Sequence, residues 1–273
     1  MKYSVFTVIM PDHSIADVAK KLREWGYDGV EWRVHDQCHI PPKEIVGRAK
    51  EVHRISADNN LEICNLATYL HVKEVELITR VMEGAQIMGA PACRVGVPPY
   101  NRARNYNDIF SETLADLAAI EKLSEKYGVK ALIEIHFGNI TPSAGLAHRL
   151  VSNVNPKYVG VIFDPGNMIY EGMENWRLGM ELLGPWLAHV HVKNTSWDIA
   201  ETLPDGRTRW QPSAATLTGG IVDWSEVMQD LKAVGYKGYL SSEDFSRGES
   251  TEDKIRNGLR YLKALETAGP KQG

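Results

Sequence analysis

The sequence is poor in cysteine and has no long apolar run. Its three cysteines, Cys38, Cys64 and Cys93, form no CxxC pair, so we expect neither a disulfide framework nor a zinc knuckle. The chain begins with a strand-like run and lacks the charged start and cleavage site of a signal peptide. No stretch approaches the roughly 18 apolar residues of a membrane span. We therefore expect a cytoplasmic protein that does not bind membranes.

The sequence also lacks an excess of charge of either sign. Lys and Arg number 31 against 35 Asp and Glu, which gives a formal net charge of −4. Proteins that bind nucleic acids concentrate basic residues on one surface, so we do not expect a nucleic acid among the partners. Hydrophobic residues make up 43% of the 273 residues, and a chain of this size can bury a core that is stable without disulfide bonds.

Apolar runs alternate with amphipathic stretches along the whole chain. Most of the runs are continuously apolar, which is typical of parallel strands buried on both faces. The predicted strands are 3–10, 29–34, 61–68, 92–97, 131–136, 159–164, 187–193 and 238–245. The predicted helices are 14–25, 42–60, 72–88, 106–127, 144–152, 175–183, 224–234 and 251–267.

Eight strand–helix alternations predict an α/β fold, a single (β/α)8 TIM barrel domain over residues 1–273. Glycines at the joins, such as Gly26 and Gly128, supply left-handed helix stops. The alternative, an open doubly wound sheet, usually has a glycine-rich turn after its first strand. Here 11–13 are Pro-Asp-His, which favours the barrel.

One connection, 194–223, is unusually long and rich in turn-forming residues. Long loops in compact domains often serve as lids or binding loops. We expect this loop to overhang the barrel mouth, and covering a ligand is one alternative, though not the favoured one, for its Trp210. The last residues, 268–273, have the composition of a frayed tail.

Four metal-type side chains stand near the ends of four different predicted strands: Glu134, Asp164, His191 and Glu243. The carboxyl ends of barrel strands meet around one mouth, and a charge in an apolar strand is costly unless it is paired or bound to metal. Three carboxylates and one imidazole suit one divalent cation, with Mn²⁺ as the first choice and Mg²⁺, Co²⁺, Fe²⁺ or Zn²⁺ as alternatives. Open coordination positions on such an ion predict an enzyme.

The alternative reading of these charges is a set of buried salt bridges, such as Glu31 with Arg33 or with Lys193. His189 shares the face of His191 but lies deeper in its strand, where a core histidine is the simpler interpretation.

Five segments, in order, resemble the xylose-isomerase-like TIM barrels, in the branch of sugar (phosphate) isomerases and epimerases. The resemblance covers nearly the whole chain. The segments are Gly26-Tyr-Asp-Gly-Val-Glu31, Ile-Glu134-Ile-His136, Phe-Asp164-Pro-Gly-Asn167, His189-Val-His191-Val-Lys193-Asn and Gly235-Tyr-Lys-Gly-Tyr-Leu-Ser-Ser-Glu243.

The resemblance implies a divalent-metal-dependent isomerase or epimerase that acts on a small sugar or keto-sugar by proton transfer through an enediolate. It implies that Glu134, Asp164, His191 and Glu243 bind the metal and that the two glutamates are also the catalytic acid and base. It further implies a homo-oligomer. The substrate contacts that it implies are Glu31, His136, Asn167 and Lys193.

Other activities share this framework. A lyase or dehydratase acting on a keto-sugar, keto-inositol or glycoside would use the same first step, and the sequence leaves that choice open. An apurinic endonuclease is disfavoured because Asn167 and Asn194 stand where the related nucleases carry histidine and aspartate. A non-catalytic binding protein is disfavoured by the intact acid and base candidates Glu134 and Glu243.

Overall fold

The computed structural model describes residues 1–268, so the tail expected at 268–273 lies outside it except for Ala268. Eight parallel strands form a closed barrel, because β1 pairs with both β2 and β11. The barrel strands are β1 (Lys2–Phe6), β2 (Gly29–His35), β4 (Glu62–His71), β5 (Ala92–Gly96), β6 (Lys130–Glu134), β7 (Val159–Phe163), β8 (Leu187–Val192) and β11 (Tyr239–Ser242). The predicted fold class is confirmed.

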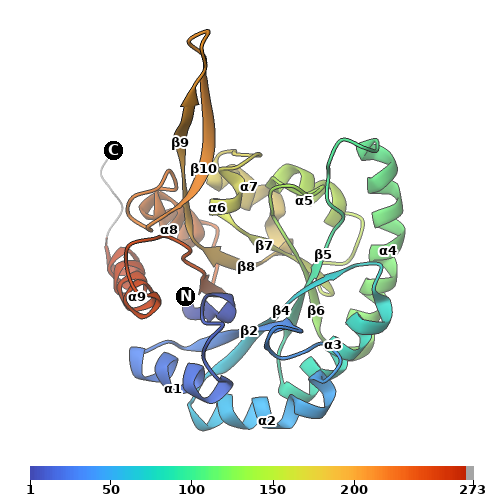
Figure 1. Cartoon of the computed structure of the whole chain (residues 1–273). Helices are drawn as coiled ribbons and strands as arrows, with labels where there is room; N and C mark the ends of the chain where they lie inside the picture. Colours follow the sequence, from blue (N-terminus) through green and yellow to red (C-terminus); the bar gives the residue numbers. More distant parts are fainter. Residues whose placement is uncertain (269–273) are drawn as a thin grey trace.

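The longer helices surround the strands on the outside of the barrel (Figure 1). They are α1 (Ile15–Trp25), α2 (Ile45–Asp58), α3 (Val75–Met88), α4 (Tyr106–Tyr127), α5 (Ala144–Val151), α7 (Trp176–Leu183), α8 (Trp224–Ala233) and α9 (Thr251–Thr267). The side chain of Ser14 accepts a hydrogen bond from the Asp17 N–H at the start of α1. Gly26 ends that helix in the left-handed region at φ 85°. Both features follow from the sequence pattern.

Several short elements depart from the simple alternation. They are the 3₁₀ turns η1 (Thr7–Ile9) and η2 (Gly184–Trp186), the strand β3 (Cys38–His39), the one-turn helix α6 (Pro165–Met168) and the strands β9 (Asn194–Thr202) and β10 (Thr208–Ala215). Of these, α6 and β9 begin directly after barrel strands that carry candidate site residues.

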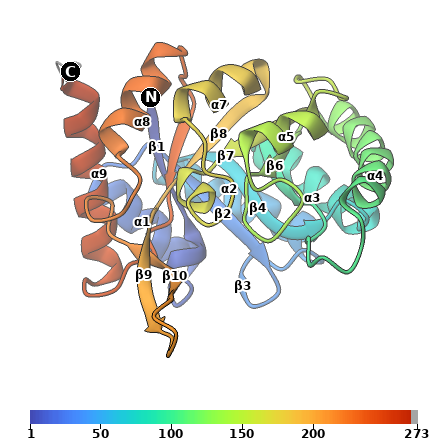
Figure 2. The same cartoon turned by 90° about the horizontal axis from the view of Figure 1, so that it is seen from above.

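The connection that we expected to be a loop over the mouth is a β-hairpin. β9 and β10 pair in antiparallel fashion over most of their length. Figure 1 shows the hairpin projecting beyond the ring of helices, and Figure 2 shows it on the side where β3 follows the end of β2. Trp210 is 55% exposed on this hairpin. The structure therefore places Trp210 outward and not over the mouth.

The apolar core fills the space between the strands and the helices. Trp32 and Trp224 are among the largest fully buried side chains. Inside the barrel, Ala92, Leu132 and Ile162 form a separate small cluster. Toward the carboxyl ends of the strands, the residues that face the barrel interior are polar. The candidate site therefore lies at that end of the barrel. Among residues 1–268, no helix combines the length and apolarity needed to cross a membrane.

Candidate functional site

Side chains from four barrel strands or their ends converge inside the mouth. Glu134 ends β6, Asp164 follows β7, His191 lies in β8 and Glu243 follows β11. One potential ligand atom from each of the four lies within 4.8 Å of the others, and all four side chains are buried. The topology thus brings together residues that are more than one hundred positions apart in the sequence.

The imidazole of His191 lies at the centre of this group. Its Nδ1 atom is 3.0 Å from Glu134 Oε1, 3.3 Å from Glu243 Oε1 and 3.7 Å from Asp164 Oδ2. Phe6 stacks on the ring from β1 with a centroid distance of 5.6 Å, which restricts its tilt. One nitrogen of His191 therefore faces all three carboxylates.

Lys193 places a second positive charge on the same carboxylates. Its Nζ atom is 2.8 Å from Asp164 Oδ2 and 2.5 Å from Glu243 Oε1. The ammonium group partly offsets the negative charge of the cluster, and so does the imidazole when it is protonated. Burial opposes that form, but the carboxylates favour it by raising the pKa of His191. A metal ion binding here would share these oxygens with Lys193.

The pKa values in the cluster follow from burial and charge. Burial opposes ionisation of Glu134, but Arg94 and His191 hold its pKa well below the ordinary value. Burial acts in the same way on Glu243, and Lys193 and His191 lower its pKa to about 2. For Asp164 burial prevails and its pKa is raised, although Lys193 opposes the shift. The neighbouring positive charges therefore favour the carboxylate form of both glutamates and make each a weaker base.

The donor set fits a divalent cation. Three hard carboxylates and one borderline imidazole form an oxygen-rich set of the kind that Mn²⁺, Mg²⁺ or Zn²⁺ takes. Glu134 Oε2 is buried and has no hydrogen-bond partner among the described residues. The ion pair with Arg94 Nη1 at 2.9 Å offsets part of the cost of burying this oxygen, and a bound cation would offset more of it.

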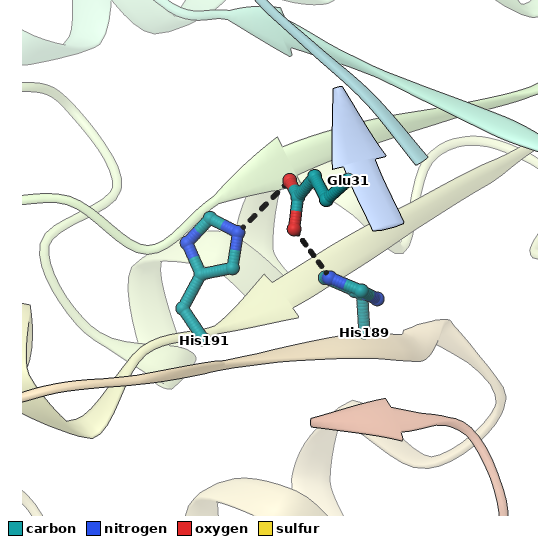
Figure 3. A group of neighbouring side chains, drawn as sticks. All are labelled: Glu31, His189 and His191. Carbon is teal, nitrogen blue, oxygen red and sulfur yellow. Dashed lines mark hydrogen bonds and ion pairs between the residues drawn. The ribbon is translucent and has the colours of Figure 1, made fainter. Parts of the chain in front are cut away.

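A second buried group holds His191 from its other side (Figure 3). Glu31 Oε1 is 3.1 Å from His191 Nε2, and Glu31 Oε2 is 2.9 Å from His189 Nε2. Asn65 donates a further hydrogen bond of 2.8 Å to Glu31 Oε1. If Glu31 accepts the Nε2–H of His191, the lone pair on Nδ1 points at the carboxylate cluster. The salt bridges of Glu31 with Arg33 or Lys193, which the sequence left open, do not form.

Asp164 and Asn167 are arranged by the helix start at α6. Asp164 is the N-cap, and its Oδ1 accepts the backbone N–H of Asn167 at 2.8 Å. The Asn167 side-chain amide lies 2.8 Å from Asp164 Oδ2 and 3.2 Å from Glu134 Oε1. Pro165 at the first helical position favours this turn, because its ring fixes φ and its missing N–H is not needed there.

The four expected substrate contacts fall into two pairs. Glu31 and Asn167 have no exposed surface, and their polar atoms contact the metal-type residues. We therefore propose that these two side chains position the cluster. His136 and Lys193 retain some exposure and stand nearer the open end. They keep the predicted role of substrate contacts.

A cavity of about 220 Å³ adjoins the cluster on one side and is lined by Tyr69, Arg94, Glu134 and His136 among others. Arg94 Nη1 is 2.9 Å from Glu134 Oε2, in a geometry that makes an ion pair but no hydrogen bond. Sequence reasoning missed Arg94, although it is a charge in an otherwise apolar strand, the same signal that identified Glu134.

A larger cavity, of about 790 Å³, opens at the other end of the barrel. It is lined by the first residues of strands, such as Ala92 and Lys130, and by the segment before β11. The carboxylate cluster does not line it. We place the site at the smaller cavity, because that one contacts Glu134 and lies at the carboxyl ends of the strands, where barrel enzymes carry their catalytic residues.

Comparisons with known proteins agree with this architecture. The model of a family described as xylose isomerase-like TIM barrel matches residues 19–265. Inosose dehydratase 1 of Bacillus cereus is 24% identical over 181 residues, which is 64% of this chain and 59% of that protein. The chain thus matches about three fifths of the length of that relative.

Solved structures resemble the whole chain. A 3-keto-D-glucoside 4-epimerase from E. coli superposes with a TM-score of 0.75 at 18% identity, covering 97% of this chain and 99% of that one. The IolI protein, solved with a bound zinc atom, gives a TM-score of 0.78 at 17% identity and covers 98% of both chains. At these identities the structures share the fold.

Proposed function

Because this chain belongs to the xylose isomerase-like TIM barrel family, we propose that it is a divalent-metal-dependent sugar or keto-sugar isomerase or epimerase. The observation that carries the proposal is the convergence of Glu134, Asp164, His191 and Glu243 within 4.8 Å of one another. These four residues would hold the cation, with Mn²⁺ as the first choice. When bound, the cation would polarise a substrate carbonyl and stabilise negative charge on its oxygen.

Glu134 and Glu243 are the proposed acid and base. Neighbouring cations favour the carboxylate form of each, and the glutamate that begins the reaction as a carboxylate takes a proton from the carbon next to a carbonyl. The electron pair of that C–H bond moves into the enediolate of the substrate. If the opposite glutamate enters the reaction protonated and gives that proton to the other face, the product is an epimer and the first glutamate keeps the abstracted proton. If the same glutamate returns it to the former carbonyl carbon, the product is an isomer.

The surrounding residues would hold these carboxylates in place. Asn167 links Glu134 to Asp164, and Glu31 fixes the nitrogen of His191 that faces them. Lys193, 2.5 Å from Glu243, keeps that carboxylate ionised. Lys193 would donate a hydrogen bond to a hydroxyl or carbonyl oxygen of the substrate, and His136 would bind one of its hydroxyl groups.

Dehydration is the second candidate, favoured by the match to inosose dehydratase 1. It begins with the same proton abstraction. The enediolate then expels a hydroxyl group from the neighbouring carbon as water, with the proton supplied by an acid of the site. The two reactions differ in whether the carbon regains its proton.

The test is a deuterium wash-in screen of ketoses and keto-inositols in heavy water, after elemental analysis of the purified protein. We expect stoichiometric divalent metal and incorporation of deuterium next to the carbonyl. Glu243→Gln should lower the exchange rate about 10²- to 10⁴-fold, because a carboxylate that carries a proton contributes that much. Near-normal exchange in that variant with metal bound would remove Glu243 from the role.

A further inference from the structure

Two arginines stand side by side on the inner wall of the barrel mouth. Arg33 in β2 is in register with Ala67 in β4, and Ala67 is in register with Arg94 in β5. All three share the inward face, because Glu31 and Asn65, two positions before Arg33 and Ala67, bond to each other inside the barrel. The small side chain of Ala67 leaves room between the two longer ones.

Tyr69 connects the two guanidinium groups. The Cζ atom of Arg94 lies 4.7 Å from the centroid of its ring, and the Cζ atom of Arg33 lies 5.3 Å from it. The ring is 43% exposed, so this group opens toward solvent at the mouth. Both guanidinium groups therefore lie against one ring at the mouth, with Arg94 also contacting Glu134 and Arg33 also contacting the Cys38 thiol. We call Arg33, Tyr69 and Arg94 the arginine wall.

Arg33 has no carboxylate partner within the described residues. Its guanidinium contacts the Cys38 thiol and the Tyr69 ring, and no salt bridge joins it to a carboxylate in residues 1–268. Its Nε atom is buried and has no hydrogen-bond partner there. A guanidinium that is partly withdrawn from water without an anion is costly. An anion that comes with a ligand would offset this cost.

The charge balance of the mouth points in the same direction. Four carboxylates (Glu31, Glu134, Asp164 and Glu243) face three cationic side chains (Lys193, Arg33 and Arg94). A divalent cation bound to the cluster would leave one net positive charge with the histidines neutral. The charge of Arg94 is balanced by Glu134 of the metal-type cluster, whereas the charge of Arg33 is balanced by none of these carboxylates. The surplus is the charge of Arg33.

We propose that the arginine wall is a carboxylate subsite, and that the substrate is an acidic sugar or a hydroxy-keto acid. The planar fork of a guanidinium matches a carboxylate with two parallel hydrogen bonds. The cavity of about 220 Å³ is lined by Arg94, Tyr69 and Glu134 but not by Arg33, and it has room for the part of the ligand that lies next to the cluster. This assignment rests on the proposed function, because the carboxylate cluster would act on the other end of the same molecule.

The experiment is isothermal titration of the full chain with matched neutral and acidic ligands: D-glucose with D-glucuronate, and glycerol with D-glycerate. D-Glucose 6-phosphate distinguishes a phosphate from a carboxylate preference. We expect each acid to bind at least about tenfold more tightly than its neutral partner, the gain that charge-assisted hydrogen bonds provide. The advantage should shrink with added salt. Equal binding of acid and neutral ligand, or a preference for the phosphate, would overturn the proposal.

Variants of Arg33 show whether the tighter binding of the acid depends on this residue or on chelation of the metal by the acid. Arg33→Gln should abolish the preference for the acid, and Arg33→Lys should keep part of it, because the charge stays while the fork is lost. Arg54→Gln, at an exposed arginine paired with Asp58 on α2, is the matched control and should bind like the parent chain. Arg33→Gln should also keep or raise Tm, since it removes an unpaired charge. A loss of Tm with an intact acid preference would make Arg33 structural.

The outcomes for the two proposals are distinct. Suppose that the parent chain shows no deuterium wash-in with any ligand, like Glu243→Gln, while acids still bind through Arg33. The proposed function then fails and the subsite stands. If neutral sugars exchange deuterium and the acids gain nothing from Arg33, the function stands and the subsite fails.

Discussion

Glu31→Gln tests the arrangement that holds His191, with almost no change in shape. In the parent chain both carboxylate oxygens of Glu31 face imidazole nitrogens, at 3.1 Å from His191 and 2.9 Å from His189. An amide offers an oxygen to one ring and an NH₂ to the other. If the NH₂ faces His191, the imidazole must carry its proton on Nδ1, the atom that faces the carboxylate cluster. If the oxygen faces His191, the bond loses its charge assistance.

In either orientation the metal affinity should fall. Replacing a carboxylate that orients a metal-binding histidine typically weakens affinity about 10- to 100-fold, which is about 1.4 to 2.7 kcal/mol. Glu31→Ala should do more damage to the fold, because it leaves buried donors of His189, His191 and Asn65 without an acceptor. Each such orphaned group costs about 1–3 kcal/mol.

The assay is a competition titration of the metal-free chain with Mn²⁺ against a fluorescent chelator, with thermal unfolding on the same samples. Glu62→Gln is the matched control: it removes one carboxylate from β4, but at an exposed position that contacts Lys2 and Tyr239. Nitrogen NMR of the Mg²⁺- or Zn²⁺-loaded chain should find the proton of His191 on Nε2. Unchanged Mn²⁺ affinity in a well-folded Glu31→Gln chain would refute the reasoning.

Three further predictions concern the neighbourhood of the cluster. Lys193→Met should increase the rise in Tm that Mn²⁺ produces, because the ammonium group no longer shares Asp164 and Glu243 with the ion; an equal or smaller rise in a thermal scan would contradict this. Gly166→Ala should lower Tm, because the new Cβ would lie 2.5 Å from the Cγ of Lys193 and one of the two must shift. An unchanged Tm would show that the packing around Gly166 accommodates a methyl group. Trp210→Ala should leave kcat/KM within about twofold, because this side chain lies on the outward hairpin; a large loss would mean that the hairpin closes over the mouth during turnover.

Much of the barrel can be predicted from the sequence, because its strands and helix ends are marked by residues that are close together in the chain. Continuous apolar runs mark the eight strands, and the Ser14–Asp17 cap and Gly26 mark the ends of α1 as the structure has them. The four metal-type residues can be predicted for a related reason: each is an ionisable residue near the end of an apolar run. The hairpin carries a local signal too, the Asp205-Gly206 turn, which its polar composition outweighed.

What the sequence determined by itself is which residues face inward and that charges gather at the carboxyl end of the barrel. Only the tertiary structure decided the partners: Glu31 with the two histidines of β8, Arg94 with Glu134, and Arg33 without a carboxylate. The reason is that periodicity along one strand fixes the face of a side chain. Its neighbours depend on register between strands and on closure of β1 against β11, which join residues more than two hundred positions apart.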